Sequence, residues 1–390
     1  MNFHQTFKSI INIASNNSSC ITKKTSLLVL ITLHVSSMAI AQSFKTSKIN
    51  KIADSLMTAG EIPELGYAVI KPNRILLVET LGFHRSDLKN AKNAAKLSDY
   101  FHLASNTKAI TGFIAGHMVE QGKVHWETKF FDLFPELKEE SNPAFYNISL
   151  ADLLSHRAKI QPYTSGSEYK SVPEFTGDPS GKRTQFVKYI LKGSPAQNTG
   201  EPYIYSNAGY SIAALMLEKT SNKTWEALVE EVLHKDLTLN YKLGWPNKSD
   251  MNQPWGHSIE NDQLTPLPGN MKYNLALGEP AGDISMPLTD YAKFIQLNLK
   301  GLIGENNYLK SSTYNFLHYG IKDYAIGWGN VNSDQEQFSE HAGSAGTFYS
   351  YTLIDKRNQI AYIILANSGT ERAKKAIHEL LDSLINKVSN

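Results

Sequence analysis

Three serines in this chain stand three residues before a lysine, a spacing that could pair a nucleophile with a base. The pairs are Ser86–Lys89, Ser105–Lys108 and Ser167–Lys170. The first and third lie in polar stretches. Only the second is followed by apolar residues at helical spacing, which are Ile110, Phe113, Ile114 and Met118, with Gly122 where such a helix should end. The second pair is therefore the candidate for nucleophilic catalysis.

Lys108 is well placed in the sequence to act as a base for Ser105. Residues three apart share a helix face, so the lysine amine can reach the serine hydroxyl. Burial would lower the pKa of the amine and let it accept a proton at neutral pH. A helix N-terminus would also favour developing negative charge. In the alternative interpretation, Ser105 only caps the helix and Lys108 is solvated. The spacing alone does not separate the two.

Two downstream segments carry further candidate residues. In an extended Tyr205-Ser206-Asn207, the first and third side chains would point the same way. Alternatively this segment is a turn whose Asn207 caps the next helix, and both interpretations can hold together. His341-Ala342-Gly343-Ser344 comes just before a strand that we predict from Thr347, where it could present a backbone N–H group to a substrate. Alternatively it is an ordinary glycine loop.

A serine–lysine pair with two downstream triplets is known from β-lactamases and penicillin-binding proteins. The chain resembles the serine β-lactamase and D-alanyl-D-alanine carboxypeptidase family, in the branch of class C β-lactamases, related esterases and D-amino-acid peptidases. The likeness runs from about Ile49 to the C-terminus. It rests on Phe101 to Lys108, Leu150 to His156, Tyr205 to Tyr210, Pro280 to Ser285 and Ile326-Gly327-Trp328. Arg157-Ala158-Lys159-Ile160 departs from the Thr-Ser-Gly-Leu type of the family.

The resemblance implies how these residues would act. Ser105 would attack a carbonyl and form an acyl-enzyme, with Lys108 and Tyr205 sharing the work of the base. Asn207 would bind the substrate amide or hold the lysine. The backbone N–H groups of Ser105 and Ser344 would form an oxyanion hole.

The third segment differs from the penicillin-recognising branch in a way that bears on the substrate. By resemblance, His341 and Ala342 stand where that branch has a lysine and a threonine, which bind the substrate carboxylate, and Gly343 follows them. An imidazole with an ordinary pKa near 6.5 is mostly neutral at pH 7 and charged only at lower pH. Arg157 or Lys159 could supply a replacement cation. We therefore expect weak β-lactamase activity and better turnover of simple esters or small amides.

The elements that would position these residues belong to an α/β (α+β) fold. Apolar runs at 66–70 and 74–79 predict one hairpin, and runs at 347–355 and 360–366 predict another. The simplest architecture is an antiparallel sheet from about 49–100 and 323–390, flanked by helices, with a mostly helical region at about 105–300. We expect a helix from Thr289 to about Leu299 that stops at Gly301. Residues 161–184 and 245–270 should be loops.

The N-terminus has the order of charges and apolar residues found in a secretory signal. Lys23 and Lys24 precede an apolar run from 27 to 35, and an A-x-A pattern at Ala39 and Ala41 places cleavage before Gln42. We expect export to the periplasm or medium, or anchoring if the leader is kept, and a hydrolase domain over 42–390. The only cysteine, Cys20, lies in the leader. The mature chain would then have no cysteine nucleophile and no thiolate metal site.

Composition narrows the remaining possibilities. The net charge of +2 and the lack of a basic run give no sign of a nucleic-acid partner. The twelve histidines show no metal-ligand spacing, so no metal or other cofactor is expected. The sequence contains no G-x-S-x-G motif, so it gives no support for an α/β-hydrolase.

The sequence predicts an exported serine hydrolase that acts through an acyl-enzyme on ester or amide bonds of small molecules or short peptides. It would be of the esterase or D-amino-acid peptidase type, with no membrane span after cleavage. A β-lactamase or cell-wall D-Ala-D-Ala carboxypeptidase is the alternative, and a non-catalytic binding protein of the same fold is another.

Overall fold

The computed structural model describes residues 46–197, 200–269 and 277–388, and the chain divides into two units, residues 1–52 and 53–390. In the first unit the described residues, 46–52, are helical. The predicted leader, with Cys20 and the expected cleavage before Gln42, lies outside the described residues. The elements below all belong to the second unit.

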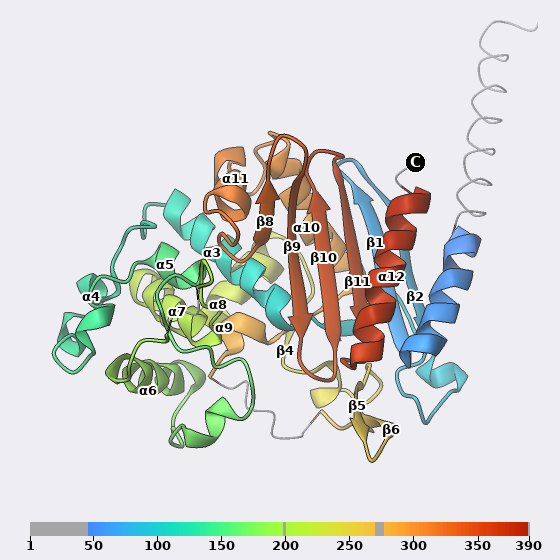
Figure 1. The fold of residues 1–390 in the computed structure, drawn as a ribbon, viewed down its shortest axis with the longest axis horizontal. Helices are drawn as coiled ribbons and strands as arrows, with labels where there is room; N and C mark the ends of the chain where they lie inside the picture. The colour runs from blue at the N-terminus through green and yellow to red at the C-terminus, as the bar shows by residue number, and fades with distance from the viewer. Residues whose placement is uncertain (1–45, 198–199, 270–276, 389–390) are drawn as a thin grey trace, which may run out of the picture. The chain divides into compact units, whose positions relative to one another are not determined.

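Six antiparallel strands form the main sheet (Figure 1). In spatial order they are β2 (Arg74–Gly82), β1 (Glu64–Lys71), β11 (Ile360–Ala366), β10 (Tyr349–Asp355), β9 (Gln337–Ser344) and β8 (Gly329–Asn332). The two ends of this unit meet in the middle of the sheet, where Leu65 pairs with Ala366. This confirms the predicted sheet from both chain ends and both predicted hairpins.

Two strands of this sheet, β8 and β9, were not expected from the sequence. His341 to Ser344 are the last four residues of β9 and not a loop before a strand, and β10 begins at Tyr349 instead of Thr347. The β9 sequence is mostly polar, so no alternation of apolar and polar residues marks it. Its pairing with β10 on one side and β8 on the other makes it a strand.

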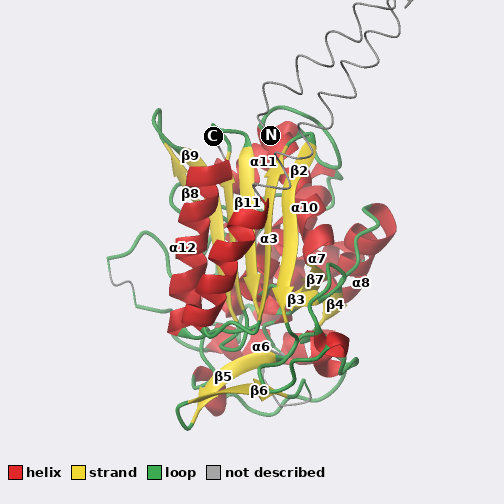
Figure 2. Ribbon diagram, turned by 90° about the vertical axis from the view of Figure 1, so that its right-hand side faces the viewer, coloured by secondary structure: helices red, strands yellow, loops and turns green. Residues whose placement is uncertain are grey.

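Helices cover both faces of the sheet. α12 (Glu371–Val388) packs on β10 and β11, and α10 (Leu288–Leu302) packs on β1 and β11 from the opposite side (Figures 1 and 2). Gly301 was expected to stop α10 but lies inside it. A Cβ atom there would come within 1.9 Å of the Tyr314 ring on α11 (Ser311–Tyr319). This glycine therefore allows two helices to approach closely and does not terminate one.

The predicted helical region lies between β2 and β8 in the chain. Its helices are α3 (Thr107–Glu120), α4 (Phe130–Leu133), α5 (Leu150–Leu154), α6 (Pro179–Lys192), α7 (Asn207–Ser221), α8 (Trp225–Val229), a π-helical turn (Glu230–Asp236) and α9 (Glu279–Gly282). A small sheet orders β3 (Tyr100–His102), β7 (Ile284–Pro287) and β4 (Lys242–Leu243), and β5 (Gly256–Glu260) pairs with β6 (Gln263–Leu267). Both expected loops are thus partly regular: α6 begins inside 161–184, and 245–270 contains the β5–β6 hairpin.

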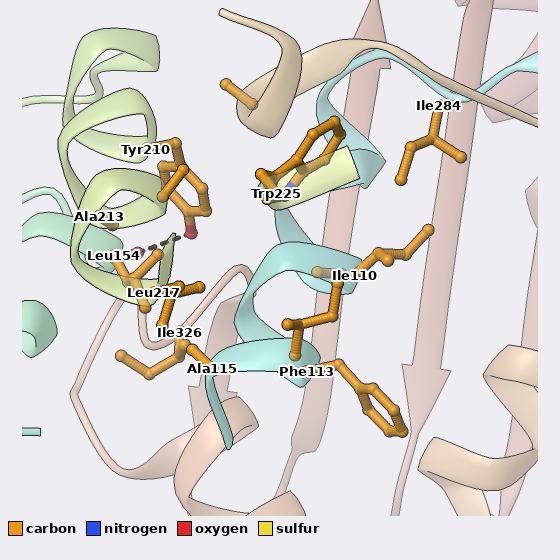
Figure 3. Close-up of a cluster of buried hydrophobic side chains, with 14 of the residues drawn as sticks. Ile110, Phe113, Ala115, Leu154, Tyr210, Ala213, Leu217, Trp225, Ile284 and Ile326 are labelled. Carbon is orange, nitrogen blue, oxygen red and sulfur yellow. Dashed lines mark hydrogen bonds between the residues drawn. The ribbon is translucent and has the colours of Figure 1, made fainter. Parts of the chain in front are cut away.

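The core of the helical region is built on α3. Ile110, Phe113 and Ala115 of this helix belong to a cluster of buried side chains, whose other labelled members are Leu154, Tyr210, Ala213, Leu217, Trp225, Ile284 and Ile326 (Figure 3). The Tyr210 hydroxyl donates a hydrogen bond to the Leu154 carbonyl at 2.7 Å, which joins α7 to the end of α5. Burial of this helix from several sides fixes the direction in which its first turn points.

Among the described residues, no helix combines the length and hydropathy needed to cross a bilayer.

Candidate active site

Ser105 lies in a single 3₁₀ turn (Ala104–Asn106) directly before α3. Ala104 adopts a left-handed conformation with φ of +46°, which is uncommon for a residue with a side chain. The turn is held by its neighbours: the Ser350 hydroxyl donates to the Leu103 carbonyl at 2.6 Å, and the Asn106 amide donates to the Ser350 hydroxyl at 2.7 Å. A strained residue held by buried hydrogen bonds is typical of a functional site.

Lys108, in the first turn of α3, is fully buried beside Ser105. Its Nζ lies 2.7 Å from Oδ1 of Asn207, 2.9 Å from the carbonyl oxygen of Ala281 and 3.3 Å from Oγ of Ser105. Burial lowers the pKa of Lys108 well below its ordinary value. No carboxylate forms an ion pair with it in the described part of the chain.

The structure contradicts the alternative in which Ser105 caps a helix and Lys108 is solvated. The N-cap residue of α3 is Asn106, not Ser105, and the lysine has no exposed surface. Both other serine–lysine pairs lack this environment. The hydroxyls of Ser86 and Ser167 bond to Leu264 and Ser165, and Lys89 and Lys170 are exposed.

Tyr205 and Asn207 both line the same cleft as Ser105, as their spacing in an extended segment predicts. Ser206 caps α7 through a bond from the Gly209 N–H to its hydroxyl, so Asn207 is the first residue of the helix and not its cap. The Asn207 amide also donates to the Tyr163 carbonyl at 2.9 Å, which directs Oδ1 to Lys108. The Tyr205 ring lies 4.6 Å from Nζ of Lys108. Burial raises the pKa of Tyr205, and a hydrogen bond with Ser105 acts in the opposite direction.

His156 accepts hydrogen bonds from the backbone around Tyr205 and so holds this segment in place. Its position in the sequence motif did not reveal this role. The residue is buried and left-handed, with φ of +64°. Its Nδ1 accepts the Ser206 N–H at 3.1 Å, and its carbonyl accepts the Ile204 N–H at 3.0 Å. Burial lowers the pKa of His156 well below its usual range. The neutral ring and the main-chain carbonyl of His156 therefore hold the backbone after and before Tyr205, respectively.

Strand β9 forms the wall opposite this segment. Its side chains alternate, so Ala342 and Ser344 face the cleft while His341 and Gly343 point inward. A Cβ atom on Gly343 would lie 2.2 Å from the Leu103 carbonyl oxygen, 2.4 Å from Oγ of Ser350 and 3.0 Å from the Ser105 nitrogen. Only glycine permits so close an approach, and this approach brings the Ser344 backbone next to Ser105.

His341 does not have the environment expected of a carboxylate ligand. It is buried and is absent from the described residues that line the cleft. Its Nδ1 donates to the Ala342 carbonyl and its Nε2 accepts from the Tyr324 hydroxyl, each at 2.9 Å. Burial lowers its pKa to about 3. The ordinary pKa assumed from the sequence is therefore wrong, because the fold desolvates this ring.

Arg157 and Lys159, the two candidate replacement cations, are not among the described residues that line the cleft. The Arg157 guanidinium donates to the carbonyls of Ser155, Tyr324 and Lys322, so it joins two loops and does not face a substrate. Lys159 is exposed and is not among the described residues that line the cleft.

The cleft has a volume of about 980 Å³. Its described lining consists of Ala104, Ser105, Gln161, Pro162, Thr164, Ala196, Gln197, Tyr203, Ile204, Tyr205, Asn207, Gly282, Ala342, Ser344 and Ala345. None of these side chains carries a formal charge at neutral pH. The arrangement can therefore activate a hydroxyl beside a neutral amine in a polar but uncharged cleft.

A family model for β-lactamases matches residues 49–385. The chain is 22% identical over 346 residues to "Protein flp" of Staphylococcus aureus strain N315, and the match covers 87% of this chain and 66% of that protein. It is 28% identical over 211 residues to an N-acetylmuramyl-L-alanine amidase of Bacillus subtilis strain 168, covering 51% and 47%. The chain thus spans less than two thirds of the length of these relatives.

Two solved structures show the same fold. A penicillin-binding protein homologue from Pyrococcus abyssi, described as octameric, superposes with a TM-score of 0.69 at 17% identity, covering 87% of this chain and 77% of that one. A class C β-lactamase superposes with a TM-score of 0.68 at 19% identity, covering 87% and 97%. This confirms the predicted fold class of antiparallel sheet with flanking helices and an inserted helical region.

The close approach of β9 to Ser105 gives the first prediction. Gly343→Ala should move β9 away from the turn that carries Ser105 and destabilise the protein by about 1–3 kcal/mol. If Ser105 is a nucleophile, its labelling by a fluorophosphonate should slow about 100-fold. Gly329→Ala on β8 is the control, since its Cβ would meet nothing nearer than 3.5 Å. Wild-type labelling and thermal stability of Gly343→Ala would show that this contact does not position the site.

Proposed function

This chain belongs to the β-lactamase family, which comprises serine acyl-enzyme hydrolases and their relatives, and on that premise we propose that it is itself an active serine hydrolase. It would cleave ester or amide bonds of small substrates through an acyl group on Ser105. The observation that carries the proposal is the Lys108 amine, fully buried 3.3 Å from the Ser105 hydroxyl.

The hydrogen bonds of Lys108 suit a neutral base. A neutral amine has two N–H donors and one lone pair. The carbonyl oxygens of Asn207 and Ala281 accept two N–H groups, and Oγ of Ser105 is the third neighbour of Nζ at 3.3 Å. In a neutral amine the lone pair would face this hydroxyl and accept its O–H. A third N–H, as in an ammonium group, would compete with that proton.

The reaction follows from this geometry. As Oγ of Ser105 bonds to the substrate carbonyl carbon, its proton passes to Lys108, directly or through the Tyr205 hydroxyl. The carbonyl oxygen becomes an oxyanion, which the N–H groups of Ser105 and Ser344 would stabilise by about 2.7–4 kcal/mol per donor. The bond to the leaving group breaks as that group takes the proton, and water then hydrolyses the ester on Ser105 by the reverse proton path.

A non-catalytic binding protein would not need this lysine. A buried amine whose neighbours are all neutral must give up its proton to fold, which costs stability at neutral pH. A leucine or methionine in the same place would avoid that cost. The retention of such a residue beside a serine held in a strained turn supports catalysis.

The uncharged cleft favours neutral substrates. The carboxylate of a β-lactam or of a D-alanyl peptide would find no cationic side chain among the described lining residues, and Ala342 offers no hydroxyl. Simple esters and small amides lack that carboxylate. One relative bears the name of an amidase, which supports an amide as the second candidate substrate.

Two variants test the nucleophile and the base. Ser105→Ala should abolish fluorophosphonate labelling and ester hydrolysis, whereas Ser86→Ala and Ser167→Ala should keep both.

Lys108→Arg should lower kcat/KM by about 10²–10⁴-fold, because a guanidinium does not release its proton. Since the pKa of Lys108 is depressed, wild-type activity should be retained at neutral pH and should fall as acid protonates the amine. An active Ser105→Ala, or Lys108→Arg at wild-type rates, would contradict the proposed mechanism.

The substrate preference is tested by comparing kcat/KM for a short-chain nitrophenyl ester and a chromogenic cephalosporin. Loss of two carboxylate contacts should cost the cephalosporin about 3 kcal/mol, roughly a hundredfold. The ratio should stay constant from about pH 5.5 to 8.5, because the pKa of His341 is about 3 and the ring stays neutral. Faster cephalosporin hydrolysis across this range would favour the β-lactamase alternative.

We also propose that the protein is exported, on the charge–apolar–small order of residues 23–41. N-terminal sequencing of the protein from an envelope fraction should find Gln42, or a residue close to it, at the new N-terminus. Soluble cytoplasmic protein with an intact leader would show that the segment does not direct export.

A further inference from the structure

A second cluster of chemically active side chains lies outside the cleft. Glu64 begins β1, His84 follows β2 and Asp99 precedes β3. Their exposed fractions are 0%, 1% and 2%, and one potential metal-ligand atom from each lies within 4.8 Å of the others. Twenty and fifteen residues separate them in sequence, so no ligand spacing predicts the group. The pairing of β1 with β2 brings the first two together.

The cluster has buried polar atoms without partners. As an ionised carboxylate, Glu64 has no hydrogen-bond partner within the described chain, and Nδ1 of His84 has none either. Only a protonated Glu64 could donate a hydrogen bond to Asp99. Nε2 of His84 lies 2.9 Å from Oδ2 of Asp99. Buried polar groups are nearly always hydrogen-bonded, and a buried carboxylate without a partner is especially costly. These free atoms point to a ligand.

The surrounding backbone holds the three residues in place. The Glu64 N–H donates to Oδ1 of Asn367 at 2.7 Å, and the Asn367 amide donates to the His84 carbonyl at 3.1 Å. The Lys96 N–H donates to Oδ2 of Asp99. Outer hydrogen bonds of this kind commonly orient the ligands of a metal.

We propose that Glu64, His84 and Asp99 bind a divalent transition-metal ion, with Zn²⁺ as the best match. One imidazole and two carboxylates are a ligand set that zinc accepts, and a +2 charge balances both carboxylates. Ligand atoms about 2.0 Å from a tetrahedral zinc lie roughly 3.3 Å apart, close to the separation between His84 and Asp99. The ion would join the starts of β1 and β3 to the end of β2. Its role would be structural, and it is independent of the proposed hydrolase activity.

A proton is the competing occupant. Burial and the nearby Asp99 charge raise the pKa of Glu64 well above its ordinary value, so a neutral carboxyl group could replace the ion. The two states differ in a measurable way. A metal site needs Glu64 as an anion and loses its ion when the side chain becomes an amide, whereas a protonated Glu64 is closely mimicked by glutamine.

The test is metal content and thermal unfolding of the full chain. Because the ligands are buried, the protein should be refolded from denaturant with either EDTA or Zn²⁺ before desalting. We expect about one zinc per chain by mass spectrometry of the metal and a Tm about 5 °C or more above the EDTA-treated sample. Glu64→Gln and His84→Gln should each lose the zinc and the difference in Tm.

Asp87→Asn is the matched control, because Asp87 lies in the same loop but is exposed and paired with Arg85. The Asp87→Asn variant should keep both the bound zinc and the difference in Tm between the two samples. Wild-type protein that is refolded with Zn²⁺ and retains no zinc after desalting would overturn the proposal, whether or not the variants fold. Zinc retained by both glutamine variants would place the ion elsewhere and overturn it as well. A Glu64→Gln variant as stable as the wild type in both conditions would identify the protonated carboxyl as the occupant.

Discussion

The Lys108 amine is buried among neutral acceptors, and the rest of the cleft is arranged around it. Asn207 at the start of α7 and the Ala281 carbonyl in α9 accept its two N–H groups, while Ser105 lies one turn before it. A charged amine would not be stable there without a carboxylate. Below the unfolded pKa the unfolded chain binds a proton that the folded chain excludes, so the stability contributed at this residue rises with pH. If Lys108 is the base that we propose, the fold gives up some stability to hold it deprotonated beside the Ser105 hydroxyl.

This arrangement depends on how α7 and α9 are held together. The buried Arg183 of α6 pairs with Glu218 of α7, Glu226 of α8 and Glu279 of α9, the last at 3.3 Å. Burial raises the pKa of Glu279 to about 8 even though the Arg183 charge acts to lower it. One guanidinium thus connects the helix that carries Asn207 to the turn that carries Ala281. Buried pairs of this kind fix geometry more surely than they add stability.

Patterns within short stretches of the sequence predicted the elements that form between residues close together in the chain. The spacing of apolar residues predicted the two hairpins and α3. The Ser105–Lys108 pair was chosen because helical spacing of apolar residues begins directly after it. Strand β9 and the inward direction of His341 could not be predicted in this way. The strand depends on pairing with β10, which its own polar sequence does not indicate. Its position in the site depends on the contact of Gly343 with Leu103, a residue far earlier in the chain. Gly301 was misjudged for the same reason, since its close neighbour is Tyr314 of another helix.

In the proposed mechanism, the neutral base and the uncharged cleft are linked by electrostatics. A substrate carboxylate bound near Lys108 would stabilise the ammonium form and raise the lysine pKa, which would remove the base. By resemblance, the penicillin-recognising branch meets this need with a further cation that offsets the substrate charge. Here the corresponding His341 is buried, neutral and engaged at both ring nitrogens. With no second cation facing the described part of the cleft, an anionic substrate would weaken its own catalyst, whereas a neutral ester would leave the amine deprotonated. If Lys108 is the base, as we propose, the lack of a cation among the described cleft residues would select against carboxylates twice, first in binding and again in the proton transfer that follows.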